Sequence, residues 1–267
     1  MTSSLYESYV IGHKPAIYPV LAGAKQLLSN QFPTEPNSIY VPDNWGGDEY
    51  DGKTLSEYSQ LFWLADHFAS RRNLPEFVHI AQYRKFVALK SGITRATNTP
   101  YVFTVSPINA PEYTLKSDAI SEVIEGHRSE LVGPVLKIRS VLDNFNTYHI
   151  LEDVLNFCSS IATHELLEKS KVVEFLHFPY LIPAPSLGLH KTSFFLDDIR
   201  LMKSIWKQFQ RQFKVNRTGY QRRVGGFLLE RFHSFRIMTR KLSGETVLHF
   251  ANQFVVTEDL NFVRPTT

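Results

Sequence analysis

The feature of the sequence that most constrains its fold is an alternation of apolar runs and helical segments in the first 86 residues. The run "SYVIGHKP" predicts a strand that stops at Gly12, residues 18–29 predict a short helix, and "SIYVPDN" repeats the strand-then-loop pattern. A longer helix then leads to "EFVHIAQYRKF", residues 76–86, which begins as a core strand. This order predicts an α/β fold with a mainly parallel central sheet flanked by helices.

The helix before that last strand has the strongest pattern in the sequence. Thr54 and Glu57 have the spacing of a capping box, in which each side chain accepts a hydrogen bond from a backbone N–H group at the helix start. Pro75 follows the expected end of the helix. The apolar residues fall on one helical face: Tyr58, Leu61, Phe62, Ala65, Phe68 and Ala69.

Beyond residue 90 we expect further strands and a helical C-terminal part. Strands are predicted in "PYVFTVSP" and "ELVGPVL", a helix over residues 151–161, and irregular structure in the proline-rich "HFPYLIPAPSLGLHK". The segment "FFLDDIRLMKSIWKQFQRQF" is predicted to begin as a strand and to continue as a helix, with Asp197 and Asp198 at the positive end of that helix. A last helix over residues 220–238 precedes "ETVLHFANQFVV", which forms either a final strand or a loosely packed tail.

Length and composition set broad limits on the class of protein. A chain of 267 residues, with 43% hydrophobic and 21% charged residues, is ordinary for a soluble globular protein and long enough for one large domain or two small ones. We find no internal repeat, low-complexity tract or linker. The simpler expectation is one domain over residues 1–267.

Cysteine content and apolar runs indicate the compartment. Cys158 is the only cysteine, which excludes an internal disulfide and a thiolate zinc cluster and fits a reducing environment. The start "MTSSLYESYVIGHKP" lacks the features of a signal peptide, and no segment reaches the ~20 apolar residues of a membrane span. We therefore expect a cytoplasmic protein.

Charge is unevenly distributed along the chain. The net charge is +3, but residues 197–241 contain twelve Lys or Arg and three acids, which leaves +9 in that segment and −6 in the rest. Such a segment can contact nucleic acid, anionic lipid or a phosphorylated small molecule, or it can be an ordinary solvated helix face.

Several common motifs are absent from the sequence. No G-x-G-x-x-G follows the first strand and there is no P-loop, so the usual phosphate cradles for dinucleotides and ATP are missing. The histidines never take the H-E-x-x-H spacing of a zinc hydrolase, and no G-x-S-x-G occurs. These absences argue against a dehydrogenase, an ATPase, a zinc hydrolase and an α/β-hydrolase.

Polar residues follow three of the predicted strands. Gly12, His13 and Lys14 follow the first, Asp43 and Asn44 the second, and Gln82, Tyr83, Arg84 and Lys85 the third. If the strands are parallel, all three clusters lie on one rim of the sheet, where ligands of open α/β sheets bind. A rim with these cations beside one carboxylate suits a diphosphate and a sugar, although each cluster alone is more typical of a solvated surface.

These residues also resemble a known family. "DNWGGDEYDGKTLSEYSQLFWLADH" followed by "FVHIAQYRKF" resembles a bacterial domain family from capsule and O-antigen gene clusters that includes galactofuranosyltransferases. "YQRRVGGFLLERF" resembles its Arg-Val-x-Gly-Phe-x-x-Glu-Arg segment, and "IGHKP" its opening, so the resemblance spans about residues 9–238. The matching positions are Asp43, Asn44, Glu57, Leu61, Phe62, Trp63, Tyr83, Arg84, Lys85, Phe86, Arg223, Val224, Gly226, Phe227, Glu230 and Arg231.

Three departures from the family pattern affect the expected site. Gln82 stands where the family has a histidine, Lys85 replaces an arginine, and the Asp-x-Gly-Asp spacing is disturbed at Gly46, Gly47 and Asp48. Lysine keeps the charge but loses the planar guanidinium that binds a phosphate through two hydrogen bonds. A changed donor or acceptor, or reduced activity, would follow.

The resemblance implies a GT-A-like glycosyltransferase that acts in surface polysaccharide synthesis. It would be a hexosyltransferase that inverts the configuration of the transferred sugar. Its donor would be a nucleotide diphosphate sugar, most simply UDP-linked and with galactofuranose as one option, and its acceptor a glycan or lipid-linked molecule. Such an acceptor would place the enzyme at the inner membrane face, with residues 197–241 against anionic lipid. The implied donor-binding residues are Gly12, His13, Lys14, Asn44, Gln82, Tyr83, Arg84 and Lys85.

The resemblance leaves the charge stabilisation and the base open. We find no Asp-x-Asp at a strand end, so we expect Arg84, Lys85 and Lys14 to face the diphosphate without a metal, with Mn²⁺ or Mg²⁺ as the alternative. Arg84 could also simply pair with an acid.

Three carboxylates are candidates for the base: Glu57, Asp43 and Glu230. Glu57 also suits a helix start, Asp43 a sugar hydroxyl, and Glu230 a buried ion pair with Arg223. Arg223 and Arg231 are candidates for binding the acceptor or a phosphate.

Two other readings remain at this point. A non-catalytic scaffold could keep the fold and lose activity through the changes at Gln82 and Lys85. A nucleic-acid-binding protein would use the basic C-terminal region and its aromatic residues, but their helical spacing marks them first as core residues, so no nucleic-acid partner is expected. These aromatic residues are Trp206, Phe209, Phe213, Phe227 and Phe232.

Overall fold

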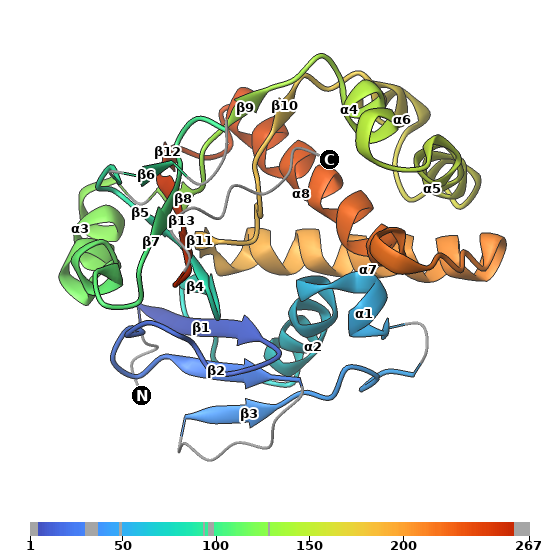
Figure 1. Cartoon of the computed structure of the whole chain (residues 1–267). Coiled ribbons are helices and arrows are strands. Elements are labelled where there is room, and N and C mark those ends of the chain that lie inside the picture. The colour runs from blue at the N-terminus through green and yellow to red at the C-terminus, as the bar shows by residue number, and fades with distance from the viewer. Residues whose placement is uncertain are drawn as a thin grey trace.

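The protein consists of a large twisted sheet with helices on both faces (Figure 1). The computed structural model describes residues 5–29, 37–47, 50–92, 94–95, 99–127 and 129–258. The strands are β1 (Tyr6–Gly12), β2 (Lys25–Leu28), β3 (Ser38–Tyr40), β4 (Phe77–Gln82), β5 (Lys85–Ala88), β6 (Thr94–Arg95), β7 (Val102–Val105), β8 (Glu130–Val132), β9 (Leu136–Lys137), β10 (Tyr180–Leu181), β11 (Gly188–Lys191), β12 (Leu248–Phe250) and β13 (Asn252–Val256). The helices are α1 (Gly52–Leu55), α2 (Glu57–Ala69), α3 (Ser117–His127), α4 (Val141–Tyr148), α5 (Leu151–Thr163), α6 (Lys169–Leu176), α7 (Thr192–Phe213) and α8 (Val224–Leu242), with 3-10 turns η2 (Ala110–Glu112) and η3 (Gly219–Arg223).

The predicted parallel sheet is confirmed where the polar clusters lie. Strands β3, β2, β1 and β4 are neighbours in that order and all pair in parallel, with Tyr9 opposite Lys25 and Ile80. Strands β7, β8, β12 and β13 run in the same direction, whereas β5, β6 and β11 run against it. The carboxyl ends of β1–β4 therefore share one rim, because parallel neighbours end on the same side.

Alternating side chains of β1 and β4 build a core on each face of the sheet. Tyr9 and Ile80 point into the larger core, which is shared with helices α2, α5, α7 and α8. Val10 and Ala81 point into the opposite core beneath Tyr18, and α3 covers another part of that face (Figure 1). Since both faces are covered, β4 is buried along its whole length.

Helix α8 approaches the first half of the chain closely through two glycines. A Cβ atom at Gly225 would lie 2.8 Å from Cη2 of Trp206 and 3.0 Å from Cδ2 of Leu55, and one at Gly226 would lie 2.8 Å from Oγ of Ser56. Glycine at both positions lets α8 lie directly against the junction of α1 and α2.

The predicted helix over residues 18–29 is wrong. Its second half is strand β2, and Gly23 has a φ of +78°, which ends any helical path there. The apolar run was ambiguous by pattern alone, and pairing of β2 with both β1 and β3 decided it.

The start of the long C-terminal helix also differs from its prediction. Helix α7 already begins at Thr192, so the run around Phe195 is helical, and the preceding strand is β11. Asp198 is buried in mid-helix, where its carboxylate binds Arg240 at 2.6 Å and Arg236 at 2.9 Å. It therefore joins α7 to α8 and does not stand at a helix end.

The predicted capping box is wrong as well. Thr54 belongs to α1 and donates its hydroxyl proton to Asp51, whose carboxylate also caps that helix. Ser56 then takes a left-handed conformation, with φ +55°, and separates α1 from α2. Glu57 is consequently the first residue of α2 and no partner of Thr54.

The other predicted elements are confirmed. Residues 102–105 and 130–132 form strands, residues 151–163 form a helix, and the C-terminal run forms β12 and β13. Of the C-terminal aromatic residues, Phe213 packs partly buried against the core and the others are buried, as expected of core residues: Trp206, Phe209, Phe227 and Phe232.

The basic segment 197–241 does not form one uniform exposed patch. Arg236 and Arg240 bind the buried Asp198, and Arg217 binds Asp153 at 2.7 Å. Among the described residues, no helix combines the length and apolarity needed to cross a membrane. Contact of this segment with anionic lipid stays a prediction.

Replacing Gly225 with alanine tests the glycine packing. The new methyl group would press on two side chains that are themselves buried, so we expect Gly225→Ala to lower the free energy of unfolding by about 1–3 kcal/mol. Gly126→Ala in α3 is the matched control, since its Cβ would meet nothing within 4 Å and helix propensity alone should stabilise it by roughly 1 kcal/mol. Urea unfolding measures both, and equal effects at the two sites would contradict the packing argument.

Candidate functional site

A cavity lies on the rim formed by the carboxyl ends of the parallel strands. It has a volume of about 410 Å³ and lies between the ends of β1 and β4, the loop after β3, and the start of α2. Of the residues predicted from sequence, the following line it: Gly12, His13, Asp43, Glu57, Gln82, Tyr83, Arg84, Lys85 and Arg223. Lys14 lies just outside this lining, and Asn44 is exposed in the turn that follows Asp43.

The polar residues that follow β4 form a tight turn between β4 and β5. Gln82 is the last residue of β4 and pairs with Lys85, the first of β5, so that Tyr83 and Arg84 form the turn between them. The backbone of this turn is fixed, since Tyr83 N–H donates to Ile11 at 3.0 Å and the Arg84 carbonyl accepts from Val256 at 2.8 Å. The side chains at this turn are thus held at the cavity.

The basic side chains of the rim contact the ring of Tyr83. The His13 ring lies 4.5 Å from it, and the Lys14 ammonium and Arg84 guanidinium each lie 5.5 Å from its centroid. A side chain at Gly12 would place its Cβ 2.7 Å from the Tyr83 Cβ, so glycine is required there. Burial and the charges of Lys14 and Arg84 lower the pKa of His13 from 6.5.

Arg84 is not engaged in an ion pair with any acid among the described residues. The alternative that it only neutralises a neighbouring carboxylate therefore has no support in this part of the chain. Its charge is available to an anionic ligand at the rim.

Two further residues support this cavity, the buried Gln60 and the half-buried Trp45. The Gln60 amide of α2 donates to the carbonyls of Gly12 at 2.9 Å and Leu27 at 2.8 Å, which ties the helix to the ends of β1 and β2. Trp45 donates to the Ser59 carbonyl at 3.0 Å and so holds the loop that carries Asp43. Gln60 lies on the opposite side of this helix from the predicted apolar face, so the helical pattern gave no signal for it.

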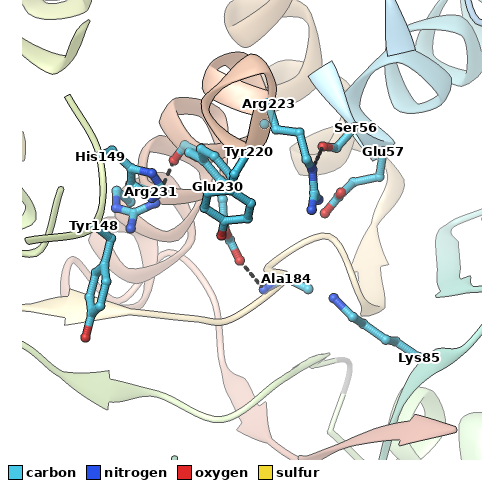
Figure 2. A pocket seen from close by; sticks show the side chains of 12 residues that line it. Ser56, Glu57, Lys85, Tyr148, His149, Ala184, Tyr220, Arg223, Glu230 and Arg231 are labelled. Carbon is cyan, nitrogen blue, oxygen red and sulfur yellow. Dashed lines mark hydrogen bonds between the residues drawn. The ribbon is translucent and has the colours of Figure 1, made fainter. Parts of the chain in front are cut away.

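A second cavity of about 200 Å³ adjoins the first (Figure 2). Both cavities are lined by Ser56, Glu57, Lys85 and Arg223. The remaining walls of the second cavity come from α4, η3 and α8 and from the segment before β11: Tyr148, His149, Ala184, Tyr220, Gly226, Phe227, Glu230 and Arg231. We call the two spaces the rim cavity and the helix cavity.

Glu57 lies at the junction of the two cavities. The left-handed backbone of Ser56 starts α2 at this point, and the Ser56 hydroxyl accepts a hydrogen bond from Arg223 Nε at 2.9 Å. Burial raises the pKa of Glu57 above 4.5, and the negative charge of Glu230 raises it further. The positive charges of Lys85 and Arg223 lower this pKa and offset part of the rise. Figure 2 shows Glu57 and Arg223 on the same side of the helix cavity.

The other two candidate carboxylates each face one cavity only. Glu230 lines the helix cavity and accepts a hydrogen bond from Ala184 N–H at 2.8 Å, so it is not the buried partner of Arg223. Asp43 lines the rim cavity and packs against Gly52, where a Cβ would come within 2.7 Å of its carboxylate oxygen. Asp48, which disturbs the family spacing, lies outside the described residues.

Arg231 lines the helix cavity but directs its guanidinium into the protein. It is buried and donates to the Asn144 side-chain oxygen at 3.0 and 2.8 Å and to the Phe227 carbonyl at 2.9 Å. Its contacts therefore fix α4 against α8. Nothing in the sequence separated this arginine from Arg223, which is exposed at the cavity.

An aromatic wall closes the helix cavity on the side away from Glu57. The His149 ring stacks on Phe227 at 4.0 Å and on Tyr220 at 6.2 Å. Burial and the charge of Arg231 lower the pKa of His149 to about 4, so this ring is neutral at physiological pH. Sequence reasoning missed this wall because it forms only where the junction of α4 and α5 meets η3.

No cluster of three or more His, Cys, Asp and Glu side chains arranged to hold a metal ion occurs among the described residues. The adjacent acids Asp197 and Asp198 lie on α7, where Asp198 is bound by two arginines. The cationic groups of the rim are suited to bind a diphosphate.

Comparison with known proteins gives one result. No family model and no curated protein matches this sequence. A solved structure, the apo form of WbbM, described as a bifunctional glycosyltransferase, is similar with a TM-score of 0.74 and 16% sequence identity. The match covers 96% of this chain and 46% of the WbbM chain, so the chain spans about half the length of that protein. The chain therefore shares the fold of the matched part of WbbM.

The raised pKa of Glu57 predicts a measurable effect on stability. Below pH 4.5 the carboxyl group is protonated in both states; as the pH rises further, the unfolded state loses its proton more readily, which disfavours the folded state. Glu57→Gln should therefore melt near the wild-type temperature at about pH 4 and above it at about pH 8, by roughly 2–4 °C for each kcal/mol relieved.

Glu122→Gln provides the control for this measurement, because its side chain is exposed on α3. Thermal unfolding at the two pH values measures both variants. A Glu57→Gln protein that melts below the wild type at about pH 8 would show that Lys85 and Arg223 stabilise the ionised carboxylate more than burial disfavours it.

Proposed function

We propose that the protein is a glycosyltransferase that moves a hexose from a nucleotide diphosphate donor, most simply UDP-linked, to a hydroxyl group of a glycan or lipid-linked acceptor. The observation that carries this proposal is the pair of adjoining cavities with a carboxyl group and cations at their junction. The rim cavity is large enough for a nucleotide sugar and the helix cavity for one acceptor sugar. The glycosyltransferase-like fold agrees with this assignment.

The donor diphosphate lies in the rim cavity in this proposal. Arg84 and Lys85 face it, Lys14 adds charge from the edge, and Arg223 reaches it from the junction. These groups offset the negative charge that develops on the leaving diphosphate. Asp43 is placed to accept hydrogen bonds from ribose or sugar hydroxyls, since it lines this cavity alone.

Transfer then takes place at the junction. The Glu57 carboxylate removes the proton from an acceptor hydroxyl, whose oxygen attacks the anomeric carbon of the donor. The bond from that carbon to the diphosphate oxygen breaks, and its electron pair leaves with the diphosphate. Attack from the side opposite the leaving group inverts the configuration of the sugar.

Glu57 is preferred as the base over Asp43 and Glu230 because of its position. It lines both cavities, whereas each of the others lines one. Its raised pKa also makes it a stronger base than an ordinary carboxylate. Glu230, fixed by Ala184 N–H, is suited to orient the acceptor.

Several parts of the proposal rest on the family resemblance. The resemblance suggests galactofuranose as the sugar and surface polysaccharide as the product. It also suggests that the enzyme acts at the inner membrane face. Lys85, one of the departures from the family, still lines both cavities, so its charge remains at the junction. Mn²⁺ or Mg²⁺ as an additional charge carrier, and a scaffold without activity, are decided by the measurements that follow.

Binding of UDP is the first measurement. Saturable binding should raise the melting temperature in a dose-dependent way. A UDP concentration of 100 times Kd should increase the free energy of unfolding by about 2.7 kcal/mol. We expect this without metal, and we expect Arg84→Ala to weaken binding by roughly 10-fold or more through loss of a charge-assisted hydrogen bond. Arg72→Ala, an exposed arginine at the far end of α2, should bind UDP like the wild type.

The outcomes of this titration separate the alternatives. If UDP binds only in the presence of Mn²⁺, a metal ion and not the Arg84, Lys85 and Lys14 side chains alone binds the diphosphate. An unchanged affinity in Arg84→Ala would remove that residue from the donor site. Failure of every nucleotide to bind would favour the scaffold.

The role of Glu57 is tested by release of UDP from UDP-hexoses, with water as the acceptor. Glu57→Gln should retain UDP binding and lose about 10²–10⁴-fold in the rate of release, because the carboxamide cannot take a proton. Glu122→Gln should keep the full rate. If Glu230→Gln is the variant that loses activity and Glu57→Gln keeps it, the base is Glu230.

A further inference from the structure

A third hollow continues the helix cavity along α4. It has a volume of about 370 Å³ and is lined by Arg139, Asp143, Asn144, Asn146, Thr147 and Tyr148, together with one apolar residue. We call it the α4 groove. Tyr148 lines both this groove and the helix cavity, so the two spaces meet at its side chain. Figure 2 shows Tyr148 on the side of the helix cavity opposite Glu57 and Lys85.

The lining of the α4 groove is polar and has no net charge. Its one cation, Arg139, and its one acid, Asp143, lie 3.6 Å apart as an ion pair. Asn146 is exposed, and 39% of the Tyr148 side chain is open to solvent. Amide groups together with an exposed tyrosine ring suit a neutral ligand that has many hydroxyl groups and flat apolar patches.

The side chain of Asn144 and the backbone at Tyr148 are fixed in place before any ligand arrives. The Asn144 oxygen accepts both hydrogen bonds from Arg231, so its amide N–H groups are directed away from that contact. The Tyr148 carbonyl accepts from the Gln221 amide at 3.1 Å, and the Asp143 N–H donates to Ser140 Oγ at 2.9 Å at the start of α4. A prearranged surface loses less conformational entropy on binding.

The charge distribution along the three spaces favours a neutral sugar acceptor over an acceptor that carries a lipid-linked diphosphate. Cations are present at the rim cavity and at the junction, through Arg84, Lys85 and Arg223. In the α4 groove, the charge of the lone arginine is offset by Asp143, 3.6 Å away. A diphosphate of a lipid-linked acceptor would gain little there, whereas sugar hydroxyls would find both donors and acceptors.

We infer that the acceptor is a neutral oligosaccharide whose terminal sugar occupies the helix cavity and whose preceding sugar units lie along the α4 groove, with Tyr148 as the platform between them. This inference rests on the proposed transferase function, since it assigns the acceptor of that same site. It goes further in that it predicts a dependence of binding on the length of the saccharide chain.

The experiment measures binding of neutral mono- to hexasaccharides of galactose, glucose and mannose to the full chain by ligand-observed NMR and calorimetry, in the presence of UDP. We expect the affinity for the best series to rise at least roughly 10-fold from mono- to tetrasaccharide. Asn146→Ala and Tyr148→Ala should each reduce tetrasaccharide affinity about 5- to 10-fold and flatten this length dependence. Asn109→Ala, an exposed asparagine in the loop before η2, is the matched control and should bind like the wild type.

Each outcome bears on the inference. If UDP raises the melting temperature but no neutral saccharide binds, or affinity does not depend on length, the inference is wrong and the donor site stands. If a glycosyl diphosphate lipid headgroup binds and loses affinity in Asn146→Ala, the groove is a lipid-acceptor site. If UDP itself does not bind, the proposed function fails separately. Length-dependent binding that is lost in both groove variants, with a normal melting transition, supports the inference.

Discussion

The close approach of α8 to the junction of α1 and α2 is the contact on which the site depends. It exists because Gly225 and Gly226 leave no side chain between that helix and Leu55 and Ser56. Helix α8 thereby brings Glu230 within the electrostatic reach of Glu57 and lets η3 present Arg223 at the Ser56 hydroxyl. Without it, the carboxyl ends of the parallel strands would carry a rim cavity but no second cavity beside it.

The same contact explains why the junction is chemically unusual. Glu57 starts a helix whose other residues are largely core, and it lies half-buried between two arms of the chain that are far apart in sequence. Its carboxyl group is held by the opposing influences of burial, a second carboxylate and two cations, which is a typical arrangement for a general base. Stability is given up at this position and is supplied elsewhere by contacts such as the Asp198 pairs with Arg236 and Arg240.

Much of the fold was predictable, and the errors have definite physical causes. The strands at residues 6–12, 38–40 and 77–82 and the helix from residue 57 follow from apolar periodicity. The segments at 18–29 and 192–198 were misassigned because short apolar runs suit a strand or a helix equally, and partner strands or helices decide between them. The polar residues at three strand ends were placed on one rim correctly, since parallel strands end together.

The sequence by itself therefore determined the α/β layers and the shared rim, because local patterning controls which residues are buried and where each strand ends. Only the tertiary structure decided that Glu57 lies between two cavities, that Arg231 binds Asn144 and not a ligand in this structure, and that Tyr148 links the helix cavity to the α4 groove. These relations join residues that are tens to more than a hundred positions apart. They depend on how closely helices pack, which is set by shape and not by periodicity.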